Sequence, residues 1–352
     1  MAHRIAVIAG DGIGPEVVAQ GLRVMRAAAD RFGFELDITE YPYGTEHWLA
    51  TEEILPDAPF AEIQQNDAIL LGAIGDPRAP VGLIERGIIG RLRWDLDLYV
   101  NLRPIKLLDE RFCPLKGKGP AEVDMVIVRE NTEDAYVQKP SFENQGTPDE
   151  VASQPMSYTR KGTERIIRYA FEMAMTRPRK HLTLIDKANA VRAQDLYTRV
   201  FAEVAKEYPE VETAHLYVDA ACMRMVESPE SIDTAVTTNL FGDIVTDLGA
   251  MLQGGMGVAA GGNINPDPGG TSMYEPMGGS APKYTGQNVI NPMAAIGAMA
   301  MLLEHSGQPE SGKRVMAAIQ HVTGTKMKSQ AAGKMGFGTT EVGDLVVDAM
   351  AG

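Results

Sequence analysis

Residues 237–250 read Thr-Thr-Asn-Leu-Phe-Gly-Asp-Ile-Val-Thr-Asp-Leu-Gly-Ala, where a β-branched run passes into an amphipathic segment. The pattern predicts a strand from Asp233 to Asn239 and a helix after it. Asp243 and Asp247 are four residues apart, so they share one face of that helix. Open α/β sheets bind ligands where strands pass into helices, and two carboxylates there suit Mg²⁺ or Mn²⁺. Taken alone, the spacing also fits a solvated acidic helix face.

The remaining chain alternates apolar strand-like runs with amphipathic helical segments, which predicts an α/β fold with a mostly parallel sheet covered on both faces. Two departures from this alternation stand out. Segment 138–160 is polar and proline-rich, and it predicts a projecting arm or hairpin. Segment 249–279 is rich in glycine and lacks helical periodicity, and its length predicts a functional loop.

Composition limits the class of protein. The 352 residues exceed the roughly 250–300 that a single hydrophobic core accommodates, so two domains are expected. A net charge of −14 argues against nucleic acid or an anionic membrane as partner. Two cysteines, no long apolar run and no leader-like N-terminus predict a cytoplasmic protein without a membrane span.

The N-terminal run Gly10-Asp-Gly-Ile-Gly-Pro-Glu16 resembles a dinucleotide fingerprint only superficially. Pro15 follows directly on Gly14, so the third glycine of the GxGxxG spacing is missing. The sequence therefore does not predict a Rossmann fold, and a cofactor is expected at the late glycine-rich segment instead.

Further residues complement the two aspartates. Arg93, Arg103 and Arg129 offer guanidinium forks that match carboxylates, and three of them would suit a substrate with two carboxylates. Each one alone also fits a surface ion pair. Near cations, the Tyr136 phenol can serve as a proton donor.

Two residues at predicted strand ends complete the set. Lys187 can act as a base where cations or a metal lower its proton affinity, and Asp219 can supply a third carboxylate to a metal. Metal, lysine, tyrosine and arginines together indicate oxidation and β-decarboxylation of a 2-hydroxy dicarboxylic acid.

The chain resembles the β-decarboxylating dehydrogenases, the family of isopropylmalate, isocitrate, homoisocitrate and tartrate dehydrogenases, over essentially its whole length. The motifs that carry the resemblance are NLRP, VRENTE, DKAN, VDA, NLFGDIVTD and EPMGGSAP, in this order. The resemblance implies two α/β domains that are not Rossmann folds, one formed by residues 1–99 and 252–352 and the other by 100–251. It also implies a homodimer in which the arm at 138–160 pairs with its counterpart.

The resemblance further implies residue roles. Asp243, Asp247 and the partner's Asp219 would hold Mg²⁺ or Mn²⁺, and Asp219 would also contact the substrate. Lys187 would reach the site from the partner subunit as base. Tyr136 would deliver the proton to carbon, and the three arginines would orient the departing carboxylate.

The substrate is indicated by Ile88 and Ile89, which stand where isopropylmalate dehydrogenases carry an apolar pair. This resemblance implies oxidative decarboxylation of 3-isopropylmalate to 2-oxoisocaproate, a step of leucine biosynthesis. Arg86 and Arg91 keep isocitrate and homoisocitrate open as alternatives, because an arginine here can bind the third carboxylate of a longer acid. Tartrate and D-malate also stay open, because dehydrogenases of the same family act on them. A non-catalytic paralogue is disfavoured, since none of the catalytic residues is missing.

The nucleotide is not decided by the sequence. Lys283 and Tyr284 resemble the pair of NADP-dependent isocitrate dehydrogenases, whereas the substrate branch favours NAD. The residues expected to contact NAD or NADP are Asn189, Glu275, Gly278, Gly279, Ser280, Ala281, Lys283, Tyr284 and Asn291.

Overall fold

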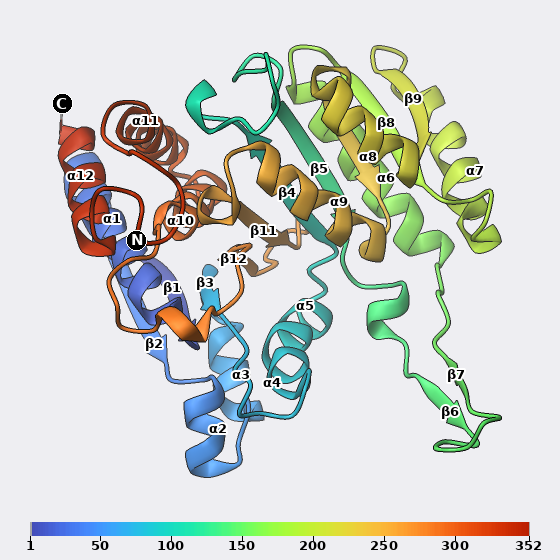
Figure 1. The fold of residues 1–352 in the computed structure, drawn as a ribbon, viewed down its shortest axis with the longest axis horizontal. Helices are drawn as coiled ribbons and strands as arrows, with labels where there is room; N and C mark the ends of the chain where they lie inside the picture. The colour runs from blue at the N-terminus through green and yellow to red at the C-terminus, as the bar shows by residue number, and fades with distance from the viewer. Residues whose placement is uncertain (1, 352) are drawn as a thin grey trace. The chain divides into compact units, whose positions relative to one another are not determined.

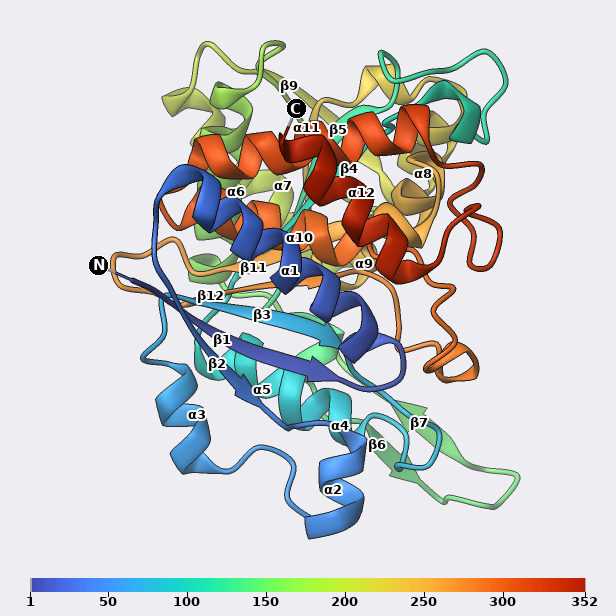
Figure 2. The same cartoon turned by 90° about the vertical axis from the view of Figure 1, so that its left-hand side faces the viewer.

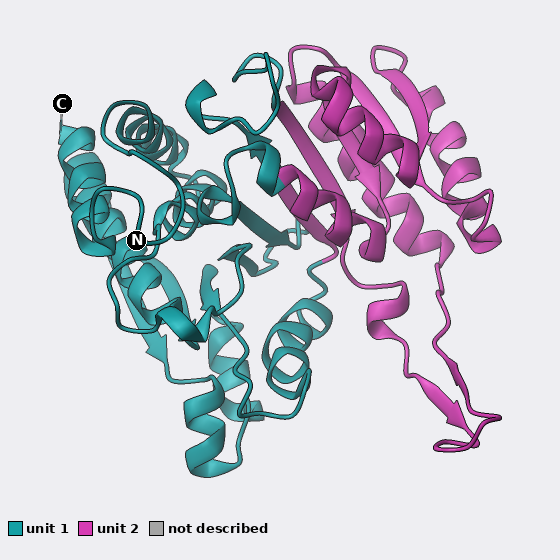
Figure 3. Ribbon diagram, viewed as in Figure 1, with its two compact units in different colours: residues 1–98, 104–123, 250–352 teal, residues 99–103, 124–249 magenta. Residues whose placement is uncertain are grey.

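The computed structural model describes residues 2–351, which divide into two compact units (Figure 3). Unit 1 comprises Met1–Leu98, Pro104–Val123 and Ala250–Gly352, and unit 2 comprises Tyr99–Arg103 and Asp124–Gly249. The chain passes between the units within strand β4 (Val100–Lys106) and within helix α9 (Asn239–Leu252). No helix among residues 2–351 is long and apolar enough to cross a membrane.

Unit 1 contains a mostly parallel sheet. Its strand order is β2-β1-β3-β12-β11, and only the last two strands pair antiparallel. In register, Ile5 of β1 lies opposite Ile38 of β2 and Ala68 of β3. The strands are β1 (His3–Gly10), β2 (Leu36–Tyr41), β3 (Ala68–Ala73), β11 (Ala260–Ile264) and β12 (Ser272–Pro276).

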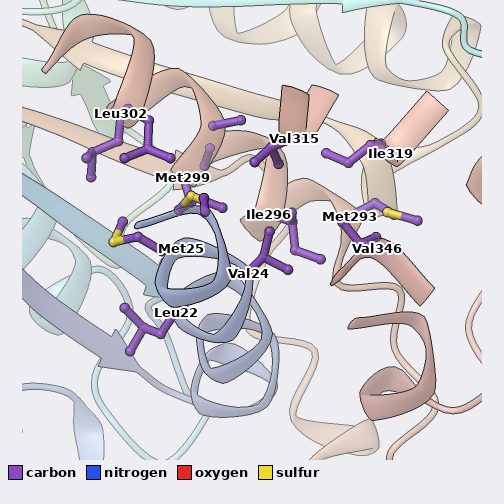
Figure 4. Packing of buried hydrophobic residues seen from close by; sticks show 14 of the residues in the cluster. Leu22, Val24, Met25, Met293, Ile296, Met299, Leu302, Val315, Ile319 and Val346 are labelled. Atoms are coloured by element: carbon purple, nitrogen blue, oxygen red, sulfur yellow. The ribbon is translucent and has the colours of Figure 1, made fainter. Parts of the chain in front are cut away.

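Both faces of this sheet are covered, because successive side chains of a strand point to opposite faces. Ile5 and Val7 join one hydrophobic cluster and Ala6 and Ile8 join another. Figure 2 shows α1 beside α12 on the first face, and Figure 4 shows part of the cluster they enclose. The first face carries α1 (Gly14–Phe32), α10 (Met293–His305), α11 (Pro309–Thr325) and α12 (Thr339–Ala351). Residues of α3 (Asp57–Ile63), α4 (Leu83–Glu85) and α5 (Arg91–Asp95) join the second cluster, and α2 (Thr45–Thr51) precedes them in the chain.

Unit 2 contains the parallel strands β5-β10-β8-β9, so that β10, a late strand, lies between two earlier ones. Its helix α6 packs on α7 through Phe171 and Phe201, whose ring centroids are 5.3 Å apart. A two-stranded hairpin, β6 with β7, projects from the unit (Figure 1). The elements are β5 (Asp124–Glu130), β6 (Ser141–Glu143), β7 (Val151–Ser153), α6 (Arg160–Thr176), β8 (His181–Asp186), α7 (Asp195–Val204), β9 (Glu212–Tyr217), α8 (Val218–Glu227) and β10 (Thr234–Thr237).

The glycine-rich segment 249–279 differs from the expected loop. It contains β11 and β12, an antiparallel pair in which Gly262 lies opposite Tyr274. A Cβ at Gly262 would lie 3.1 Å from the Tyr274 ring, so the glycine lets a buried aromatic side chain pack across the pair. The alternation of apolar and polar residues that is typical of a strand is not visible in this sequence, because β11 consists mainly of small residues.

Segment 104–123 clusters with unit 1, whereas the sequence placed it in the second domain. Leu108 and Phe112 pack against the first hydrophobic cluster of unit 1. The Arg111 guanidinium donates hydrogen bonds to the backbone oxygens of Thr323 and Gly324 at the end of α11. These contacts are distant in sequence, so local periodicity did not indicate them.

Candidate active site

The two aspartates of the opening motif lie on α9, which begins at Asn239 directly after β10. The predicted passage from strand to helix is confirmed, except that Asn239 belongs to the helix. One Asp243 oxygen accepts a hydrogen bond from the Tyr136 hydroxyl at 2.5 Å, and the other is paired with the Arg129 guanidinium. Three residues that were selected separately from the sequence therefore meet in unit 2.

Arg129 is 1% exposed, and its charge is met by two groups of α9. Its Nη1 pairs with Asp243, and its Nη2 and Nε donate to the Asn239 Oδ1 at 2.7 and 3.1 Å. Gly242 makes this approach possible, because a Cβ there would lie 2.4 Å from Arg129 Cγ. The glycine of the NLFGD motif thus has a packing role that the sequence reading did not assign.

Tyr136 lies beyond the end of strand β5. β5 ends at Glu130, and Tyr136 occupies a short turn of helix at Ala135–Val137. The Arg129 guanidinium lies over its ring, 5.3 Å from the centroid. The phenol is thereby held between a cation and Asp243, with 37% of the residue exposed.

The charge around Asp247 favours a cation. Partial burial is the largest cause that raises its pKa, and the neighbouring charge of Asp243 raises it further, against the influence of Arg103 and Arg129. Two carboxylates on one helix face therefore oppose each other's ionisation, and a hard divalent cation between them would remove that opposition.

One chain alone does not complete a metal site. Among residues 2–351, no three His, Cys, Asp or Glu side chains gather as a metal-binding group. A hard cation prefers six or more oxygen ligands, so the two α9 aspartates would need further donors. The carboxylates of Asp243 and Asp247 are of the ligand type that a hard divalent cation prefers. The remaining ligands would have to come from other groups.

Lys187 and Asp219 form a second cluster of unit 2. Lys187 follows β8, Asp219 lies in the first turn of α8, and their side chains are paired at 2.6 Å. The hydrogen bond from Lys187 is the largest influence on the Asp219 carboxyl, and it lowers the pKa of that group. The Asp219 side chain is 67% exposed, so this pair faces outward. Asn189, two residues after the lysine, is also exposed.

In unit 1, Arg93 is held by Glu275 at 2.7 Å, and Glu275 also accepts a hydrogen bond from Asn263 at 2.8 Å. Arg93 Nε is buried and has no acceptor among the described residues. A buried donor without a partner costs free energy, and a ligand carboxylate would satisfy it.

The predicted apolar pair divides in the structure. Ile88 is fully buried in the second cluster of unit 1, whereas Ile89 is only partly buried. Of the two side chains, only Ile89 has surface left for a ligand. Arg91 is bound to Asp57 at 2.5 Å, with its guanidinium over the Phe60 ring, while Arg86 is exposed and lies over Trp94.

Unit 1 also contains an apolar cavity of about 450 Å³, a size typical of small-molecule sites. Four of the expected nucleotide-binding residues line it, together with Ile13 and Val17 after the first strand. These four are Gly278, Gly279, Ala281 and Asn291. Glu275, Ser280, Lys283 and Tyr284 do not line it, although Lys283 lies exposed nearby in sequence, with its Nζ 4.8 Å from the Tyr284 ring centroid.

The N-terminal glycine run supports this cavity rather than forming a Rossmann turn. Ile13 donates its backbone N–H to the Ser280 oxygen at 2.8 Å, and the Ser280 hydroxyl donates to the Gly75 oxygen. Gly12 has φ 57°, and a Cβ there would lie 2.0 Å from the Ser280 oxygen. The two glycine-rich segments therefore need each other to build one site.

The VRENTE motif at the end of β5 contains carboxylates for which the sequence predicted no role. Glu130 accepts hydrogen bonds from the Thr132 N–H and hydroxyl, both at 2.7 Å, and from the Glu133 N–H at 2.9 Å. Burial raises the pKa of Glu130 to about 7. Three acids within five residues after a buried strand were the available signal.

We expect the stability of the protein to depend on pH through Glu130. The folded-state pKa of about 7 exceeds the ordinary 4.5, so the folded state retains a proton that the unfolded state releases. This stabilisation is complete below pH 4.5 and is lost as the pH rises through about 7. The full loss should be roughly 3–4 kcal/mol, because the pKa rises from 4.5 to about 7 and each tenfold change in proton affinity is worth about 1.4 kcal/mol. Denaturant unfolding from pH 5 to 8 measures it, and Glu130→Gln should flatten the profile; an equal slope in both proteins would contradict the assignment.

The Gly242→Ala substitution should displace Arg129. Because the new methyl would overlap the buried arginine stem, we expect unfolding free energy to fall by about 1–3 kcal/mol. Gly324→Ala in α11 is the control, since the added methyl there meets only the Asp109 carboxylate at 3.3 Å. The control should be neutral or stabilising. Equal denaturation midpoints for the two variants would show that Arg129 moves aside without cost.

Comparison with known proteins shows the family of the chain. Residues 4–346 match the family described as isocitrate/isopropylmalate dehydrogenase. A 3-isopropylmalate dehydrogenase of Thermobifida fusca is 47% identical over 99% of this chain and 98% of its own. The same enzyme of Corynebacterium glutamicum is 45% identical over 99% of each chain.

Solved structures show the same fold. An isocitrate dehydrogenase from Methylococcus capsulatus is similar with a TM-score of 0.89 and 35% identity, over 99% of this chain and 100% of that one. A β-decarboxylating dehydrogenase from Thermococcus kodakarensis has a TM-score of 0.80 and 31% identity, over 100% and 96% of the two chains. The chain belongs to the isocitrate/isopropylmalate dehydrogenase family of decarboxylating dehydrogenases.

Proposed function

We propose that this protein catalyses the metal-dependent oxidative decarboxylation of 3-isopropylmalate to 2-oxoisocaproate with reduction of NAD or NADP, a step of leucine biosynthesis. The observation that carries the proposal is the cluster in which Arg129 and Tyr136 both contact Asp243, with Asp247 one turn further along α9. It combines a cation to hold a carboxylate, a phenol to deliver a proton and two ligands for a metal.

Each residue has a defined task in this proposal. Lys187, 24% exposed, would take the proton of the substrate hydroxyl as hydride leaves for the nicotinamide. Tyr136 would donate a proton to carbon after carbon dioxide departs. The substrate carboxylates would be held by Arg103, Arg129 and Arg93. Arg93 suits this task because its Nε lacks an acceptor among the described residues.

Asp243 and Asp247 would hold Mg²⁺ or Mn²⁺, together with Asp219 of the partner subunit. When bound, such an ion supplies Lewis acidity that favours ionisation of the hydroxyl and stabilises enolate charge. Before an ion binds, the Arg129 charge and the Tyr136 hydroxyl hold the Asp243 carboxylate in place. Asp243 is therefore oriented in advance.

A homodimer with shared sites is part of the proposal. Exposed apolar side chains occur on the helices that carry the aspartates, namely Met223 and Val226 on α8 and Ile244 and Met251 on α9. Such exposure on neighbouring elements is typical of an interface between chains. The hairpin β6–β7 adds Phe142 and Val151, which are both 53% exposed.

The choice of substrate rests on two features of unit 1. Ile89 offers apolar surface that suits an isopropyl group, and Arg91 is engaged by Asp57. Because a paired arginine attracts a further carboxylate less strongly, a third substrate carboxylate would have to rely on Arg86. The relatives named 3-isopropylmalate dehydrogenase support the same choice.

The nucleotide is proposed to enter the cavity beside Gly278 and Asn291, whose apolar lining suits an aromatic base. Lys283 is exposed and lies over the Tyr284 ring. It has no acidic partner among residues 2–351, so its charge suits a 2′-phosphate. Both NAD and NADP therefore remain candidates. Isocitrate is the second candidate substrate, favoured by the likeness to the Methylococcus capsulatus enzyme.

The shared site predicts complementation between two inactive variants. Lys187→Ala and Asp243→Asn should each lower turnover at least about 100-fold, because each removes a group that acts on the reacting atoms. A heterodimer of the two, isolated through two different tags, has one complete site and should regain about half of the wild-type turnover per dimer.

The matched control is Lys187→Ala co-expressed with the Lys187→Ala, Asp243→Asn double variant, which forms no complete site and should stay inactive. A complementing pair as inactive as this control would refute the shared site. Normal turnover by Lys187→Ala alone would refute the lysine as base.

A substrate panel tests the function itself. Absorbance of the reduced nicotinamide is measured with 3-isopropylmalate, isocitrate and homoisocitrate, each with NAD and NADP and with Mn²⁺. We expect kcat/KM for 3-isopropylmalate to exceed the others by at least about tenfold, since one methyl or methylene group matched in a pocket is worth about 1–3 kcal/mol.

Preference for a tricarboxylic acid, abolished by Arg86→Ala, would replace isopropylmalate with that acid. In the nucleotide arm of the panel, Lys283→Asp should lower kcat/KM with NADP and leave that with NAD nearly unchanged. If kcat/KM falls with both nucleotides, Lys283 does not recognise the 2′-phosphate specifically.

A further inference from the structure

Asp134, in the acidic run after β5, is fully buried and has a backbone conformation that suits glycine. Its φ is 73° and its ψ −162°, a backbone conformation that residues other than glycine rarely adopt. Its carboxylate accepts hydrogen bonds from the N–H of Ala135 at 2.7 Å, the Tyr158 hydroxyl at 3.0 Å and the N–H of Leu240 at 3.0 Å. Residues with strained backbones persist where their surroundings hold them, often at functional sites.

Two of these bonds lead to the Asp243 cluster. Leu240 lies in the first turn of α9, three residues before Asp243, and its N–H is one that a helix leaves without an internal partner. Ala135 begins the turn that carries Tyr136. A single carboxylate therefore fixes the proton donor and the start of the aspartate helix to each other.

The third bond leads to the lysine cluster. Tyr158 accepts a hydrogen bond from the Gln194 amide at 2.8 Å, and the Gln194 oxygen accepts one from the backbone N–H of Lys187 at 2.7 Å. Gln194 is fully buried. Every group in this path donates toward Asp134, and burial raises the pKa of Tyr158, so the phenol remains a donor.

We propose that Asp134 is the positioning residue that holds this chain's contributions to the two shared sites, with Tyr136 and α9 belonging to one site and Lys187 to the other. The inference deepens the proposed function and rests on it. Asp134 touches no reacting atom, and it acts through Ala135, Leu240 and the path from Tyr158 through Gln194 to Lys187. Its carboxylate is the common acceptor of the network.

The test variant is Asp134→Gly, which removes the acceptor while it leaves a residue that tolerates the backbone conformation. Glu52→Gly is the matched control, because Glu52 is also an acid at positive φ, 63°, but is exposed at the end of α2. We expect kcat of Asp134→Gly to fall at least about tenfold, since small misplacement of catalytic groups costs up to 100-fold. KM for the nucleotide should stay unchanged, because its cavity lies in unit 1. Glu52→Gly should leave kcat unchanged.

Amide hydrogen exchange supplies a readout that does not depend on activity. In Asp134→Gly, exchange at Leu240 and Lys187 should accelerate at least about tenfold relative to wild type, with no change in Glu52→Gly. Asp134→Asn, which retains one acceptor oxygen, should lie between wild type and Asp134→Gly in both measurements. Unchanged exchange at Lys187, or a kcat loss that only follows the unfolded fraction in thermal melts, would overturn the proposal. Wild-type inactivity on every acid, with the expected exchange pattern, would refute the proposed function and not the network.

Discussion

The buried guanidinium of Arg129 constrains the rest of unit 2. A charge that is 1% exposed is tolerated only with partners, and α9 supplies both Asp243 and Asn239. Removing one partner of such a pair typically costs about 3–5 kcal/mol, because the other charge remains buried. The contact that docks the helix is therefore also the contact that orients the candidate metal ligand. Stability and site geometry depend on one ion pair.

The same arrangement explains how a chain with a net charge of −14 can attract a dianionic substrate. The overall field repels anions, so recognition has to be local. In the proposed site Arg103 and Arg129 would supply that local charge, and they oppose the rise in the Asp247 pKa that burial and Asp243 cause. The arginines proposed for the substrate and the carboxylates proposed for a metal therefore lower each other's electrostatic cost.

The sequence predicted the features that local patterns encode. The passage from β10 into α9 followed from periodicity and β-branching, and the hairpin at 138–160 followed from its polar, proline-rich composition. Features that depend on distant contacts were missed or altered. Ile88 carries the same apolar signal as Ile89, and only tertiary packing decides that one is core and the other partly exposed. Segment 104–123 packs on unit 1 through residues more than 200 positions away.

Asp134 was missed for a related reason, and its counterpart in unit 1 shows a common device. Asp11 follows β1, is 5% exposed and accepts hydrogen bonds from the N–H of Thr45 after β2 and of Gly75 after β3. Asp134 follows β5 and accepts directly from Leu240 after β10, and it is linked to the segment after β8 through Tyr158 and Gln194. In each unit one buried carboxylate collects the segments that follow three adjacent parallel strands.

The two carboxylates differ in backbone. Asp134 has a positive φ, whereas Asp11 does not. A conformation of this kind costs about 1–3 kcal/mol, and glycine would adopt it without strain. The Asp134 carboxylate accepts three hydrogen bonds that offset this cost. Around Asp11 the tied segments support a cavity, whereas around Asp134 they carry the lysine, the tyrosine and the aspartate helix, so the strain is concentrated where the proposed chemistry requires fixed geometry.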